Sequence, residues 1–121
     1  MRDSAQVKLE FIHNAVAGNY TPEQAEAELD RMEQDFGKTV FSPGGVTKKS
    51  RPWSRGDLKD LEMQAVDGAS SRPFFLYLAE MGEEVTRKER KKKQLTLIGT
   101  IVAVIAIIAV IAGVVRALRG T

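Results

Sequence analysis

The side chains that could carry out chemistry are few and scattered along the chain. There is one histidine, His13, and there is no cysteine, which excludes a thiolate nucleophile, a disulfide and a zinc site built on cysteines. A catalytic triad or a metal site at His13 would need partner side chains that the surrounding sequence does not offer. The carboxylates fall on expected helix surfaces, and no two are spaced as an acid–base pair. We therefore expect no catalytic residue, no metal site, no cofactor and no enzyme activity.

The densest charge lies directly before an uncharged stretch. Six of the seven residues from 87 to 93 are basic, whereas the 22 residues from 94 to 115 carry no charge. A helix of this length spans about 33 Å, close to the hydrocarbon core of a bilayer. The remaining chain is too short and too polar to surround a helix that is apolar on all sides. The sequence therefore predicts one transmembrane helix over residues 94 to 115.

The charges that flank this span predict its orientation. Basic flanks stay in the cytosol, and the far side of the span carries only Arg116 and Arg119. We expect a single-pass, tail-anchored protein with a cytoplasmic N-terminal region and a short tail, residues 116 to 121, across the membrane. The same basic residues are expected to contact anionic lipid headgroups. They are Arg87, Lys88, Arg90, Lys91, Lys92 and Lys93.

Small residues follow one face of the predicted span. Gly99, Ala103, Ala106 and Gly113 lie close together on a helical wheel. Small side chains at such spacing let the backbone of a second helix approach closely, so this face is a candidate for packing on another membrane protein or on a second copy. The alternative is that these residues are ordinary components of a lipid-facing span.

The net charge of +2 hides an uneven distribution. Residues 1 to 82 carry 10 basic and 13 acidic side chains, whereas residues 83 to 121 carry 8 basic and 3 acidic ones. The excess of basic over acidic residues therefore comes from the segment beside the membrane span. It does not indicate a nucleic-acid partner. No motif indicates a small-molecule substrate.

The residues before the span predict an all-α fold in successive segments. Residues 1 to 37 have the capping and apolar spacing of an acidic helical hairpin. A basic linker rich in Pro and Gly follows over residues 38 to 53. There Trp53 is expected at the headgroups, or alternatively packed on a helix in a solvated linker. Residues 83 to 93 form a basic juxtamembrane segment, which Gly82 can set off by a bend.

Residues 54 to 82 predict a helix followed by a short amphipathic segment rich in aromatic residues. The apolar side chains of this second segment occupy more than one face, which suits a helix in the membrane interface or in a groove on a partner. We expect the following residues to dock there: Phe74, Phe75, Tyr77, Leu78 and Met81.

The stretch "GNYTPEQAEAELDRM", after a helix that begins with "MRDSAQ", resembles the short two-helix module of SHOCT type found on bacterial membrane proteins. The resemblance covers about residues 3 to 36, with Tyr20 where an aliphatic residue is usual. It implies a role in protein–protein contact or oligomerisation and no chemistry.

We therefore expect an accessory or assembly subunit of a larger membrane complex. One alternative is a phage-type membrane-lysis or exclusion protein that associates with itself. Another is suggested by Phe75, Glu84, Val85 and Thr86, which resemble a segment of the small subunit of the general protein-translocation channel. The Trp-Pro pair usual after that segment is replaced by Arg87 and Lys88.

Overall fold

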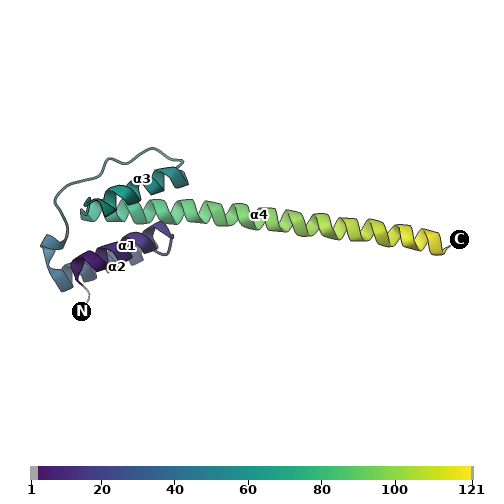
Figure 1. Cartoon of the computed structure of the whole chain (residues 1–121), viewed down its shortest axis with the longest axis horizontal. Helices are drawn as coiled ribbons and strands as arrows, with labels where there is room; N and C mark the ends of the chain where they lie inside the picture. Colours follow the sequence, from purple (N-terminus) through teal and green to yellow (C-terminus); the bar gives the residue numbers. More distant parts are fainter. Residues whose placement is uncertain (1–2, 121) are drawn as a thin grey trace. The chain divides into compact units, whose positions relative to one another are not determined.

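The computed structural model describes residues 3 to 120 and is helical, with no strand in that range. Four α-helices and one short 3₁₀ helix follow one another (Figure 1), which confirms the all-α prediction. They are α1 (Ser4–Val16), α2 (Pro22–Phe36), η1 (Lys38–Val40), α3 (Arg55–Val66) and α4 (Arg72–Arg119). The chain divides into two compact units, Met1–Arg87, here called the head, and Lys88–Thr121, here called the anchor unit.

The first three α-helices begin at residues whose side chains satisfy the free backbone N–H groups of the first turn. Each has a capping box, in which the cap side chain accepts from the third helical residue and that residue's side chain accepts in return. The pairs are Asp3 with Gln6, Thr21 with Gln24, and Ser54 with Asp57. These local contacts determine where the three helices begin.

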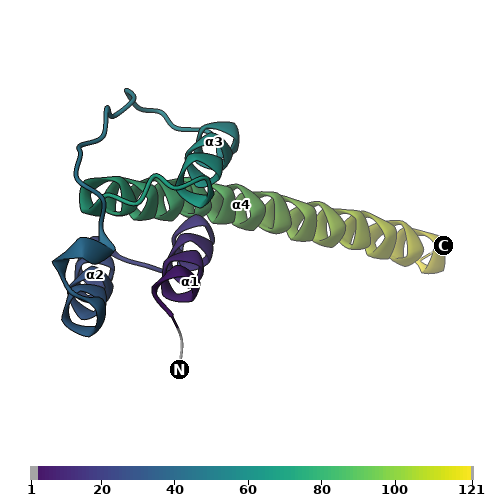
Figure 2. The same cartoon turned by 60° about the vertical axis from the view of Figure 1, so that its left-hand side comes forward.

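The core of the head lies around the first turns of α4. Figures 1 and 2 show these turns running between α3 on one side and the α1–α2 hairpin on the other. Apolar residues of α1, α2 and α3 point inward at helical spacing. From these three helices the core receives Phe11, Ile12, Ala15, Ala25, Leu29, Met32, Leu58, Leu61 and Ala65.

Gly82 brings α1 and α4 unusually close together. A Cβ atom added to Gly82 would lie only 1.8 Å from the carbonyl oxygen of Ala15, so no larger residue fits without a shift of one backbone. α4 continues through Gly82, so this glycine does not end the helix. The glycine is needed for helix packing and not for flexibility.

The predicted aromatic segment, basic segment and span are not separate elements. All three belong to α4, which begins after Ser71, whose hydroxyl accepts from the N–H of Phe74 at 3.3 Å. Residues 83 to 93 include no proline and no glycine. Most of them are charged or long side chains with good helix propensity, so nothing in this stretch ends the helix.

Most of the segment over residues 38 to 53 is exposed and without regular secondary structure, but its two ends pack on the head. Its start forms η1, and Val40 and Phe41 are buried in the core of the head. The ring of Phe41 meets that of Phe75 edge-on, with centroids 6.0 Å apart. The segment covers a surface of the head and contributes to its core.

Candidate membrane anchor and the clasp of the head

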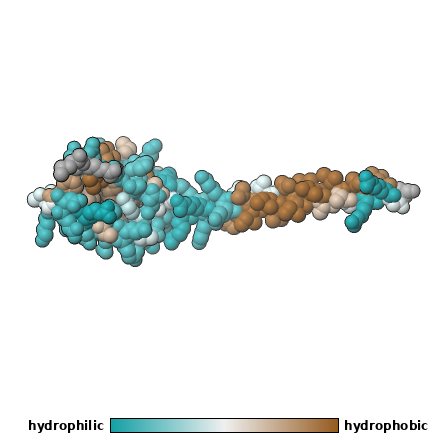
Figure 3. Space-filling model, turned by 90° about the horizontal axis from the view of Figure 1, so that it is seen from below, coloured by the Kyte–Doolittle hydropathy of each residue, from teal (hydrophilic) through white to brown (hydrophobic). Residues whose placement is uncertain are grey.

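The anchor unit contains a helical stretch that is long and apolar enough to cross a membrane. None of its most apolar window is buried within the described chain, whereas the core helix of a soluble protein would be mostly buried. Figure 3 shows this stretch as a brown band with hydrophilic residues at both ends. Leu95 to Val115 are all exposed. A bilayer would remove these side chains from water.

The two hydroxyl groups of the span are satisfied within the helix. The Oγ1 atom of Thr96 donates to the carbonyl of Lys92 at 2.9 Å, and that of Thr100 donates to the carbonyl of Thr96 at 3.0 Å. Hydrocarbon offers no hydrogen-bond partners, so a spanning segment must meet its polar groups internally. The span therefore meets this requirement near its basic end.

The small-residue face of the span has no neighbour in the described chain. Gly99, Ala103, Ala106 and Gly113 are all exposed, and no atom outside the helix lies within 4 Å of a Cβ built on either glycine. The face is open to lipid or to another helix. Its role in helix packing stays a prediction.

The predicted headgroup residues of α4 lie on its surface. Their side chains are exposed, so lipid phosphates could reach them. Their contact with anionic lipid stays a prediction. This set is Arg87, Lys88, Arg90, Lys91, Lys92 and Lys93.

The structure corrects the prediction of docking residues on the aromatic segment. All five side chains are buried in the core of the head, and none forms an exposed docking surface. They are Phe74, Phe75, Tyr77, Leu78 and Met81. Their apolar character on several faces arises because the start of α4 is covered from several sides. The ring of Phe75, for example, packs between those of Phe11 and Phe41, at 5.3 and 6.0 Å.

The prediction that Trp53 lies at the lipid headgroups is also wrong, because its side chain is 7% exposed and packs on the head. Its ring meets that of Tyr77 edge-on with centroids 5.5 Å apart, and its Nε1 atom donates to the carbonyl of Lys49 at 3.1 Å. An indole with both its apolar ring and its N–H satisfied in this way cannot lie at lipid headgroups without opening the head. The alternative interpretation, a Trp packed on a helix, is the one observed.

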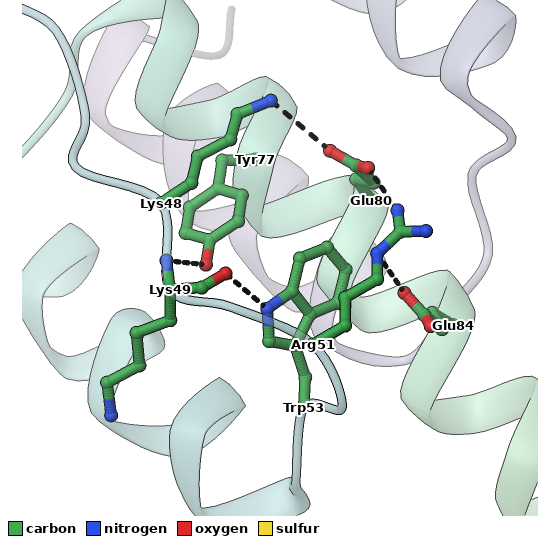
Figure 4. A network of polar contacts seen from close by, with 7 residues as sticks. All are labelled: Lys48, Lys49, Arg51, Trp53, Tyr77, Glu80 and Glu84. Carbon is green, nitrogen blue, oxygen red and sulfur yellow. Dashed lines mark hydrogen bonds and ion pairs between the residues drawn. The ribbon is translucent and has the colours of Figure 1, made fainter.

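Residues 48 to 53, here called the clasp, form the last part of the segment over residues 38 to 53. They hold this segment against α4 (Figure 4). The backbone N–H of Lys49 donates to Tyr77 Oη at 2.9 Å. Arg51 binds Glu80 at 2.7 Å and Glu84 at 3.2 Å. Its guanidinium carbon also lies 4.7 Å from the centre of the Trp53 ring. One basic side chain therefore joins two turns of α4 to the clasp.

A second charged contact ties the clasp to α3. Lys49 Nζ lies 3.0 Å from Asp57 Oδ1, and Asp57 Oδ2 accepts from the backbone N–H of Ser54 at 3.0 Å. The Ser54 N–H, and then the Lys49 ammonium, lower the pKa of Asp57 below its ordinary value. The same carboxylate thus caps α3 and holds the clasp.

The clasp was missed by sequence reasoning because its partners on α4 lie far along the chain, as Tyr77 is 28 residues from Lys49 and Glu80 is 29 residues from Arg51. In the predicted basic linker, Lys48 lies 3.6 Å from Glu80, and Lys49 and Arg51 are paired as described above. The available signal was Glu80 and Glu84 at a spacing of four, which places two acids on one face of a helix. Within residues 3 to 120, no group of three or more His, Cys, Asp or Glu side chains could hold a metal ion.

Comparison with known proteins adds no relative: no protein-family model, curated protein or solved structure matches this chain. The resemblance of residues 3 to 36 to the SHOCT module stays a prediction. The physical features of the span and the head are thus the basis for a functional hypothesis.

Proposed function

We propose that this chain is a non-enzymatic, single-pass membrane protein whose helical head serves as an accessory or assembly subunit of a membrane complex. The observation that carries the proposal is the apolar stretch of α4, which has no covering in the described chain although the head buries its own apolar residues. Exposed apolar surface of this length is unfavourable in water and favourable in lipid. The head has its own core, and the face of the head seen in Figure 3 is largely hydrophilic.

The orientation follows from the charge on the two flanks. Six basic residues precede the span, and two follow it. Basic flanks are retained in the cytosol, so the head is cytoplasmic and residues after Val115 lie across the membrane.

An assembly role is supported by the surfaces that stay available. The aromatic side chains of α4 form the core, so a partner must use the outside of the head or the open face of the span. Gly99 and Ala103 belong to that open face and would allow close helix contact.

Membrane insertion is tested first with Ile105→Arg plus Ile108→Arg in the full chain. Each arginine near the centre of a span costs about 3 kcal/mol on insertion scales, so the variant should move from the carbonate-resistant membrane fraction to the supernatant. The matched control is Ala27→Arg plus Gln34→Arg on the exposed surface of α2, which should stay in the membrane fraction. A wild-type chain that carbonate extracts would contradict the proposal.

The assembly role is tested by mild-detergent purification from native membranes, followed by mass spectrometry and native-size analysis. A second protein at fixed stoichiometry supports an accessory subunit. Recovery of this chain alone, together with toxicity on induced expression, would contradict that role and support a self-associating membrane protein. Gly99→Leu with Ala103→Leu should disrupt a complex formed through the span while leaving insertion intact. An unchanged complex would show that this face is a plain lipid surface.

A further inference from the structure

The anchor unit carries an open groove where its basic stretch meets the apolar span. The groove has a volume of about 530 Å³ and follows one side of α4. Figure 3 shows the hydrophilic stretch of this unit passing directly into the apolar band. The residues that line the groove are all exposed, and they are Lys92, Lys93, Gln94, Thr96, Leu97 and Thr100.

The N-terminal end of the groove offers hydrogen-bond donors and positive charge. Lys92 and Lys93 each carry an ammonium group with three N–H donors, and the amide of Gln94 adds two more. Within residues 3 to 120, neither lysine forms an ion pair with a carboxylate. An ionised phosphate offers only acceptors and negative charge, so it is complementary to this end of the groove.

The other end of the groove is apolar in character. The hydroxyl groups of Thr96 and Thr100 donate to backbone carbonyls of the same helix at 2.9 and 3.0 Å, so their protons are not offered to a ligand. The threonine methyl groups and the side chain of Leu97 remain as lining. Donors at one end and hydrocarbon at the other match a ligand with an anionic head and an apolar tail.

We propose that this groove binds one molecule of an anionic phospholipid. Its phosphate lies on Lys92 and Lys93, and the first part of an acyl chain lies along Thr96, Leu97 and Thr100. The inference rests on the proposed span, which begins at residue 94 and so places the two lysines at the level of the headgroups. The proposed orientation puts the groove in the cytoplasmic leaflet, where anionic lipids are found.

This site is more specific than a general attraction of the basic stretch to a negative surface. A diffuse attraction would depend on all six basic residues before the span to a similar extent. A lipid in the groove depends on two of them and also on the shape of the apolar end. An inorganic phosphate would use only the polar end and would leave the apolar lining uncovered.

The charge at the groove is tested by native mass spectrometry of the full chain in mild detergent. The probes are phosphatidylglycerol, which is anionic, and phosphatidylcholine, which is zwitterionic. We expect the wild-type chain to retain phosphatidylglycerol about tenfold more than phosphatidylcholine. Lys92→Gln plus Lys93→Gln should lower this retention about tenfold. The matched control Arg87→Gln plus Arg90→Gln removes the same charge and should lower it less than about twofold.

The shape of the groove is tested by filling its apolar end. Thr96→Leu plus Thr100→Leu keeps every basic residue and should lower the retention of phosphatidylglycerol about fivefold, because larger side chains occupy the place of the acyl chain. The matched control Ala109→Leu plus Ala112→Leu enlarges two side chains farther along the span and should leave retention unchanged. The emission of Trp53 checks that the head stays folded in each variant.

Three results would overturn the lipid site. They are equal retention of the two lipids, equal losses in the lysine and arginine variants, and displacement of phosphatidylglycerol by inorganic phosphate. Carbonate extraction of native membranes separates this inference from the proposed anchoring. A chain that carbonate extracts but that still prefers phosphatidylglycerol contradicts only the anchoring. A chain that resists extraction and shows no lipid preference contradicts only the lipid site.

Discussion

At the scale of single residues, the sharpest constraint is the contact between Gly82 and Ala15. Gly82→Ala places a Cβ atom against the Ala15 carbonyl, so α1 must move away from α4. We expect a loss of about 2 kcal/mol in the free energy of unfolding of the head, typical of overpacking. The measurement is denaturant unfolding of the full chain, followed by the emission of Trp53, its only tryptophan.

The matched control for this prediction is Gly56→Ala. Gly56 also lies inside a helix, yet the nearest atom to its added Cβ is the Ser54 hydroxyl oxygen at an ordinary 3.6 Å. Alanine should stabilise the head slightly there, because glycine is the poorer helix former. If both variants behave alike, the close approach of α1 and α4 is wrong.

The carboxylate of Asp57 makes the stability of the head depend on pH. Its pKa is lowered from the ordinary value of 3.8 by the Ser54 N–H and the Lys49 ammonium. A depressed pKa means that the charged form is favoured in the folded state, so the stabilisation is present above pH 3.8 and is lost as the pH falls through the lower, folded value.

We therefore predict two effects of Asp57→Asn. The free energy of unfolding of the head is lower than in the wild type at neutral pH, and it decreases less steeply as the pH falls below 3.8. The measurement is the urea midpoint as a function of pH. Asp60→Asn, on the same helix, serves as the control and should keep the wild-type slope. A wild-type slope in Asp57→Asn would contradict the role of this carboxylate.

At the scale of elements, the clasp explains how an irregular segment becomes part of the core. Tyr77→Phe removes the acceptor of the Lys49 N–H and leaves the ring against Trp53. We expect a loss of about 1 kcal/mol in unfolding free energy, as for a typical hydrogen bond, with Trp53 still buried. Equilibrium unfolding gives the energy, and the emission maximum of Trp53 reports its burial. A red-shifted maximum in the native state would show that the hydrogen bond, and not the ring, holds the clasp.

At the scale of the whole molecule, the distribution of charge decides the topology of the proposed anchor. Changing Lys91, Lys92 and Lys93 to Gln should give a mixed orientation, because it removes half of the six basic residues before the span. The measurement uses Ala27→Cys and a maleimide that does not cross membranes. We expect labelling of the otherwise wild-type chain only after cells are permeabilised, and partial labelling of the charge variant in intact cells. Full labelling of the otherwise wild-type chain in intact cells would reverse the proposed orientation.

The sequence by itself determined the features that depend on neighbours within one or two turns. The capping pairs predict the starts of α1, α2 and α3 because their hydrogen bonds join residues three apart. The uncharged stretch predicts a candidate span because length and composition alone make it suitable for a bilayer.

Only the tertiary structure decided which apolar residues are buried in the core and which basic residues form ion pairs within the head. Phe75 and Trp53 looked available for a membrane or a partner because their covering residues are distant in the sequence, as Phe11 is from Phe75. Arg51 likewise belongs to a segment predicted as a basic linker, and only the fold places Glu80 and Glu84 beside it. Burial and ion pairing depend on which distant segments meet in the fold, and a local pattern does not contain that information.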